Sequence, residues 1–155
     1  MEFQNTIAYA TAQADGGELS LSNDTWTKFP FAPNLTVSKN IVAGDTGVFQ
    51  LKVKETGVYW ADFSFIADSG DGKNYFINPY VNNAAFGTTG DVGNQIKFFQ
   101  QPTTQKYEVS TNGLFNLTRN DIIEWRIYVA TASATDFFTR NIKLTIINLQ
   151  QIGLH

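Results

Sequence analysis

Hydrophobic and polar positions alternate along much of the chain, and residues 56–67 show this pattern most fully. Successive side chains of an extended strand point to opposite faces, so every second residue shares a face. One face of this stretch is apolar and predicts a core face: Tyr59, Ala61, Phe63 and Phe65. The other face is mixed, because Trp60 and Ile66 accompany Asp62 and Ser64. A strand with water on its second face would not need a tryptophan there, so the pattern predicts a strand covered on both faces.

Two later stretches also carry apolar residues on both faces. In residues 122–130 one row is fully apolar, whereas the other row reads Ile122, Glu124, Arg126 and Tyr128. In residues 138–149 the two faces become apolar near the end, where Ile147 follows Ile146. Residues 48–53, in contrast, alternate between apolar and polar positions and predict a strand with one wet face.

Turn signals divide the chain into about ten short strands, spaced roughly every 8–12 residues. Clusters of glycine, asparagine and aspartate predict turns at residues 15–17, 68–74, 82–83, 112–113 and 119–121, and a long exposed loop at residues 84–94. Pro30 and Pro33 predict a loop, and Pro79 indicates an edge strand or a bulge. No long helical periodicity is present. The pattern predicts an all-β sandwich or barrel, and 155 residues suit a single domain.

Composition and charge exclude several functional classes. The formal net charge is -3 and no run of lysine and arginine occurs, so the electrostatic footprint of a nucleic-acid-binding protein is missing. The absence of cysteine excludes disulfides and thiolate chemistry. No apolar run reaches membrane-spanning length, and the N-terminal residues lack the charged and apolar regions of a signal peptide. We therefore expect neither nucleic-acid binding nor membrane insertion.

Candidate catalytic and metal-binding groups are sparse. The single histidine is His155, no His/Cys cluster can form a zinc site, and residues 87–93 lack the Gly-Lys-Ser/Thr of a phosphate loop. We expect no enzymatic activity and no cofactor, although a carboxylate pair for glycoside hydrolysis stays open as an alternative. Residues 68–74 favour a plain turn, because Gly70 and Gly72 stand where an EF-hand loop has ligands. A loose calcium site at Asp68 and Asp71 is the alternative.

The order of motifs resembles that of a known family. The segment Gly57-Val-Tyr59-Trp-Ala-Asp-Phe63-Ser-Phe65 resembles the Gly-x-Tyr strand of the jelly rolls shared by tumour necrosis factor and the globular head of the complement first component. Matching pieces follow in the same order, among them Ile-Ile-Glu-Trp125 and a closing Leu-Thr-Ile-Ile-Asn-Leu149, so that the similarity spans residues 25–149. The chain departs from the complement head at Ala61, where that family usually has an aromatic residue.

The resemblance implies a ten-stranded antiparallel jelly-roll sandwich that assembles as a tight three-fold trimer. It also implies that the sheet with the Gly-x-Tyr strand, the penultimate strand and the final strand faces the axis. Together with the two-faced strands, this predicts an interface at Trp60, Asp62, Ser64, Glu124, Arg126, Tyr128 and Ile147. Glu124 and Arg126 are expected to form a cross-strand or axis ion pair. The alternative is that Trp60 and Tyr128 lie beneath a loop of their own subunit.

These expectations favour a bacteriophage or bacterial-surface origin and a non-enzymatic virion module: a head fibre, a capsid decoration protein or a fibre tip. Its partners would be further copies of the chain and a capsid or fibre protein, and its location the virion or the cell exterior. Residues 1–13 are predicted to be an attachment arm anchored by Phe3, Ile7 and Tyr9, or alternatively a first strand, before a jelly-roll domain over residues 14–155. A lectin-like or cytokine-like trimer that binds a cell-surface glycan or protein is the alternative function, with candidate platforms at Tyr75, Tyr80, Phe86 and Tyr107.

Overall fold

The computed structural model describes residues 7–22, 24–69, 73–85, 96–100, 106–129 and 135–149. Strands supply almost all regular structure in these ranges, and every strand pair is antiparallel. Within the described ranges no helix is long and apolar enough to cross a membrane. The strands are β1 (Tyr9–Leu21), β2 (Thr27–Lys28), β3 (Asn34–Lys39), β4 (Ile41–Ala43), β5 (Gln50–Val53), β6 (Gly57–Ser69), β7 (Lys73–Val81), β8 (Ala84–Ala85), β9 (Ile96–Gln100), β10 (Tyr107–Leu117), β11 (Ile122–Val129) and β12 (Thr135–Asn148).

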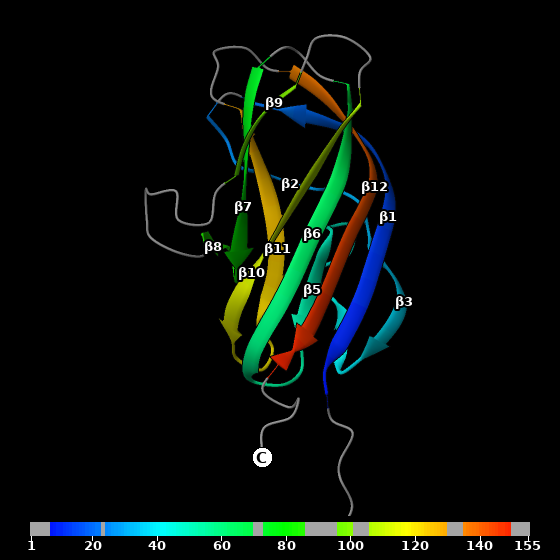
Figure 1. The fold of residues 1–155 in the computed structure, drawn as a ribbon, viewed down its shortest axis with the longest axis vertical. Helices are drawn as coiled ribbons and strands as arrows, with labels where there is room; N and C mark the ends of the chain where they lie inside the picture. The colour runs from blue at the N-terminus through cyan, green and yellow to red at the C-terminus, as the bar shows by residue number, and fades with distance from the viewer. Residues whose placement is uncertain are drawn as a thin grey trace, which may run out of the picture.

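The strands form two sheets that pack face to face (Figure 1). The five-stranded sheet has the order β10-β6-β12-β1-β3. The seven-stranded sheet has the order β4-β5-β11-β7-β8, with β2 paired to β11 and β9 paired to β7. The predicted antiparallel jelly-roll sandwich is therefore confirmed. The described residues form twelve strands where ten were predicted, and two of the twelve, β2 and β8, contain only two residues each.

Aromatic rings hold the two sheets together. Phe63 on β6 stacks on Trp125 of β11, with ring centroids 5.0 Å apart and planes 3° from parallel. The rings of Phe29 and Phe63 meet edge-on with their centroids 5.3 Å apart. The centroids of the Phe63 and Phe65 rings are 5.8 Å apart. All of these rings are buried, as the apolar face of β6 predicts. Buried aromatic pairs add directional attraction to the large apolar area that each ring removes from water.

The start of β6 shows why the Gly-x-Tyr pattern occurs. The side chain of Asn148 on β12 occupies the space into which a Cβ on Gly57 would project. Two residues later, the hydroxyl of Tyr59 donates a hydrogen bond of 2.7 Å to the carbonyl oxygen of Glu55, while its ring is buried in the core. Burial raises the pKa of the Tyr59 hydroxyl. The glycine and the tyrosine together fix how the chain enters β6, one of its long core strands.

Two predicted turns are wrong. Residues 15–17 lie inside β1, which stays paired with β12 from Tyr9 to Leu21. Gly16 has a φ of +89°, and the close approach of Thr139 on β12 leaves no room for a side chain there, so these glycines serve a distorted strand. Residues 112–113 likewise lie within β10, which pairs continuously with β6.

Other expectations for connecting segments have mixed outcomes. Pro79 lies on β7 opposite Trp125, between the stretches of β7 that pair with β9 and with β8, so it occupies an interrupted edge as predicted. The stretch that contains Pro30 and Pro33 is a loop, as predicted. The first two residues of the predicted loop at residues 84–94 form the short strand β8. Residues 86–94 lie outside the described residues.

Candidate subunit interface

One row of side chains crosses the outer face of the five-stranded sheet from edge to edge. Leu114 on β10 is paired with Trp60 on β6, which is paired with Ile147 on β12. Ile147 is paired with Tyr9 on β1, and Tyr9 with Lys39 on β3. Directly opposed residues on neighbouring strands share a face, so these side chains are consecutive neighbours. The first four residues, Leu114, Trp60, Ile147 and Tyr9, are called the apolar row below.

The apolar row is open to solvent in the single chain. Leu114 is 60% exposed, and Trp60, Ile147 and Tyr9 are only half-buried. The next two rows on the same face are polar on β10, β6 and β12, since Asp62 pairs with Asn112 and Thr145, and Ser64 pairs with Ser110 and Lys143. Two further exposed apolar residues of this sheet, Val37 on β3 and Phe138 on β12, are paired with polar residues instead. A run of four apolar neighbours therefore lies at the end of the sheet where β6 begins and β12 ends. Concentrated apolar surface of this kind marks interaction sites on folded proteins.

The two ends of the apolar row have different shapes. At the β10 edge Leu114 projects into solvent. At the opposite edge a cavity of about 470 Å³ is lined by Ile7, Tyr9, Lys39 and Ile147. The face therefore carries an apolar projection on one edge strand, β10, and an apolar hollow beside the other edge strand, β3. Figure 1 shows these two strands on opposite edges of the sheet.

The structure brings together residues that the sequence analysis assigned to two different functions. Trp60 and Ile147 were predicted to lie in the trimer interface, and Ile7 and Tyr9 in an attachment arm. Tyr9 is the first residue of β1 and is paired on both sides, so residues 9–13 belong to the first strand. Ile7 precedes that strand and lines the same cavity as Tyr9. Phe3, the third anchor, lies outside the described residues.

The expectation that the penultimate strand shares this sheet is wrong. β11 pairs with β5, β7 and β2 in the seven-stranded sheet. Its inward residue Trp125 faces the core, so Glu124, Arg126 and Tyr128 lie on the outer face of the opposite side of the sandwich. These three candidates cannot share one continuous patch with Trp60, Asp62, Ser64 and Ile147.

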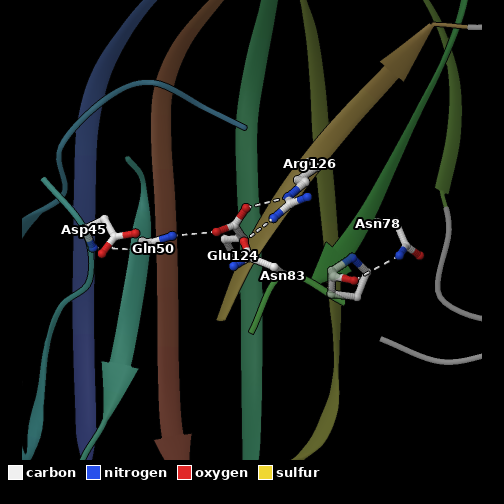
Figure 2. A network of polar contacts seen from close by, with 7 residues as sticks. Asp45, Gln50, Asn78, Asn83, Glu124 and Arg126 are labelled. Carbon is white, nitrogen blue, oxygen red and sulfur yellow. Dashed lines mark hydrogen bonds and ion pairs between the residues drawn. The ribbon is translucent and has the colours of Figure 1, made fainter. Parts of the chain in front are cut away.

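Glu124 and Arg126 belong to a network within the subunit (Figure 2). Nε of Arg126 lies 2.6 Å from Oε2 of Glu124, and the Glu124 side chain is only 3% exposed. The Gln50 amide donates to the other carboxylate oxygen and accepts a hydrogen bond from the backbone of Asp45. Arg126 also donates to Asn83. The ion pair is therefore formed by two residues of one strand, not across strands, and both carboxylate oxygens of Glu124 have partners within the chain.

Tyr128 is covered by its own subunit. Trp26, just before β2, packs on the Tyr128 ring with centroids 4.9 Å apart, and the Tyr128 hydroxyl donates a 2.6 Å hydrogen bond to Asp24. That hydrogen bond raises the pKa of Tyr128. Trp26 also contacts Tyr80, over whose ring the Arg126 guanidinium lies at 4.1 Å. Tyr128 therefore follows the alternative prediction: it lies beneath a segment of its own chain, the one that contains Trp26.

The remaining candidate sites receive little support. Asp68 forms an ion pair with Arg140, whose hydrogen bond lowers the pKa of Asp68, and Asp71 lies outside the described residues. No group of three or more metal-binding side chains occurs in the part of the chain that the structure describes. Among the candidate platforms for glycans, Tyr75 and Tyr80 are buried, Phe86 is not described, and Tyr107 is 47% exposed.

Leu114 is the interface candidate that the sequence analysis missed. It stands between Gly113 and Phe115, and Phe115 and Leu117 both point into the core. Strict alternation from those two residues would have placed Leu114 on the outer face. The expected break at residues 112–113 concealed this alternation.

Comparisons with solved structures show the same fold. The tumour necrosis factor Eiger from S. frugiperda superposes with a TM-score of 0.57 at 14% identity, covering 92% of this chain and 93% of that one. The globular domain of zebrafish complement 1qA gives 0.58 at 8% identity, with 92% and 97% covered. The vertex protein P5 of PRD1 gives 0.56 at 14% identity, with 91% and 96% covered. No protein-family model and no curated protein sequence matches the chain. The predicted resemblance to these jelly rolls is thus confirmed at the level of the fold.

Proposed function

We propose that the chain is a non-enzymatic module that assembles as a homotrimer through the outer face of its five-stranded sheet. The observation that carries this proposal is the apolar row, which crosses four strands and ends in an exposed leucine. In a single chain, Leu114 and part of Trp60 and Ile147 remain in contact with water on the outer face. A second copy that covered them would remove apolar area from water.

The shapes at the two ends of the row favour a ring over a two-fold dimer. In a ring, each copy presents one surface to the next copy and a different surface to the previous one. Leu114 at the β10 edge and the cavity beside β3 supply two such complementary surfaces. A projecting leucine that enters an apolar hollow buries more area than two leucines that meet each other. Three copies match the symmetry that the fold resemblance implies.

Cysteine cross-linking tests this arrangement directly, because the chain has no cysteine of its own. Leu114→Cys and Lys39→Cys variants are prepared separately, mixed, and treated with a short bis-maleimide. A ring predicts covalent pairs between the two different variants and few pairs when Lys39→Cys is treated alone. A Val42→Cys variant, exposed on β4 of the other sheet, serves as the control. Efficient Lys39–Lys39 cross-links, or none in any mixture, would contradict the ring.

We further propose that the trimer is a structural or binding component of a virion, such as a head fibre, a capsid decoration protein or a fibre tip. The fold shared with the vertex protein of PRD1 supports this function. Affinity purification of the tagged protein from its native source tests it, followed by electron microscopy of whatever is recovered. Recovery of capsid or fibre proteins with it is expected, and recovery of the trimer without any capsid or fibre protein would contradict the proposal.

The proposed attachment arm needs a shorter deletion than residues 1–13. Residues 9–13 are paired with both β12 and β3, so their loss would remove ladder hydrogen bonds on two sides. A variant that begins at Ile7 keeps the whole of β1 and the lining of the cavity. We expect it to stay trimeric while it loses attachment to the particle. Full attachment would show that residues 1–6 are not the arm.

A further inference from the structure

A second cavity lies at the edge of the five-stranded sheet, at the end of β3 remote from the apolar row. It has a volume of about 350 Å³, within the usual range of small-molecule sites. Its lining includes Gln13 and Asp15 from β1, Asn34 from the start of β3, and Phe31 from the loop before β3. None of the functions argued above uses these residues.

The cavity arises from a mismatch in strand length. β1 is paired with β3 only from Tyr9 to Gln13, whereas its pairing with β12 continues to Leu21. Beyond the Gln13–Asn34 pair, the free edge of β1 therefore forms one wall of the cavity, and the loop that contains Phe31 forms another. The backbone N–H and C=O groups along such an edge can form hydrogen bonds with a ligand, in addition to those that the side chains form.

The aromatic wall is held in place by the fold. Phe31 is half-buried and packs against the hydrophobic core. A Cβ built on Gly17 would lie 3.1 Å from a carbon of the Phe31 ring, so the absence of a side chain there lets the ring lie against the backbone. The ring is therefore already fixed before a ligand binds, so binding loses little side-chain conformational entropy there.

The polar walls offer a particular set of hydrogen-bonding groups. Gln13 and Asn34 each present an amide that donates and accepts, and Asp15 presents a carboxylate that only accepts. All three residues are exposed, and no side-chain hydrogen bond or ion pair engages them within the described ranges. Their capacity is therefore available to a ligand.

We propose that this cavity binds a neutral sugar residue of a glycan. A sugar ring carries hydroxyl groups around its rim, which pair with a carboxylate and with amides, and C–H groups on its face, which pack on an aromatic ring. A divalent cation fits less well, because the site contains one carboxylate. An added peptide strand also fits less well, because Gly16 at φ +89° distorts the edge of β1 that such a strand would need. The inference does not depend on the trimer.

The test uses the full chain and five probes: the methyl glycosides of glucose, galactose, mannose, N-acetylglucosamine and fucose. Each probe is titrated to millimolar concentration while backbone amide resonances are followed by nuclear magnetic resonance. We expect at least one probe to shift the amide resonances of residues 13–17, Phe31, Ala32 and Asn34. Asp15→Asn should weaken that binding about tenfold, because a hydrogen bond to a charged acceptor is lost.

A control variant separates a site from a general charge effect. Glu18→Gln removes another exposed carboxylate of β1 that does not line the cavity, and it should leave the affinity unchanged. Phe31→Ala should abolish the shifts, and the same spectra show whether its fold persists. The proposal is overturned if no probe shifts these resonances, or if Asp15→Asn binds as well as the unaltered chain. Because binding is read from each chain, a monomeric protein would refute the trimer and leave this test intact.

Discussion

Truncation of Leu114 to alanine probes the proposed assembly with little effect on the fold. Leu114 is 60% exposed in the single chain, so its methyl groups contribute little to the core. Complete burial of a leucine side chain is worth about 1.5–3 kcal/mol, and burial of the exposed share corresponds to about 1–2 kcal/mol per copy. A ring of three loses about 3–5 kcal/mol in total, or roughly two to four powers of ten in its dissociation constant.

The dissociation constant of a trimer has the dimension of a concentration squared. The protein concentration at half-dissociation should therefore rise by the square root of that factor, about tenfold to a hundredfold. Sedimentation equilibrium over a dilution series measures this midpoint for the chain and for Leu114→Ala. Val42→Ala, a truncation of an exposed side chain on the opposite sheet, is the control. Equal midpoints for the chain and Leu114→Ala, or an equal shift in the control, would refute the reasoning.

Further variants test the core, the outer network and a titrating group. Phe63→Ala removes a buried ring that stacks on Trp125 and should lower the free energy of unfolding by about 3–5 kcal/mol in urea denaturation. Trp60→Ala, on the outer face of the same strand, should instead weaken the trimer more than the fold. Equal effects of Phe63→Ala and Trp60→Ala would contradict the assignment of faces. Arg126→Met leaves the buried Glu124 carboxylate without its cation and should cost about 3–5 kcal/mol. Adding Glu124→Gln should recover part of that loss, with an unchanged mass in solution, whereas dissociation would place the pair at a subunit contact. Tyr128 has a raised pKa because its protonated hydroxyl donates to Asp24. Its contribution to stability should be complete below the unfolded pKa of about 10 and fall as pH rises through the higher folded pKa. The melting temperatures of the chain and of Tyr128→Phe are compared across this pH window. A difference that stays constant would show that the hydrogen bond to Asp24 does not raise the pKa of Tyr128.

The inward faces of the strands were predictable because alternation is a local property of the sequence. Phe63, Phe65 and Trp125 were assigned to core rows from their spacing, and all are buried. The turns predicted at residues 15–17 and 112–113 failed for a non-local reason. Glycines that signal a turn by composition here lie in long strands that stay paired with β12 and β6, and at Gly16 the strand is distorted without turning back.

Sheet membership could not be derived from alternation at all. A two-faced pattern shows that both sides of a strand are covered, but it does not identify what covers them. For Trp60 the outer neighbours are Leu114 and Ile147 of the same sheet, and the row stays open to solvent. For Tyr128 the cover is Trp26, about a hundred residues earlier in the chain. Only the three-dimensional arrangement separates these two cases.

The mass of the protein in solution tests the central claim most directly. Sedimentation velocity or light scattering at micromolar concentration should give about 52 kDa, three times the 17.3 kDa of one chain. A mass of one chain at that concentration would contradict the claim that the apolar row on the outer face of the five-stranded sheet is a subunit interface.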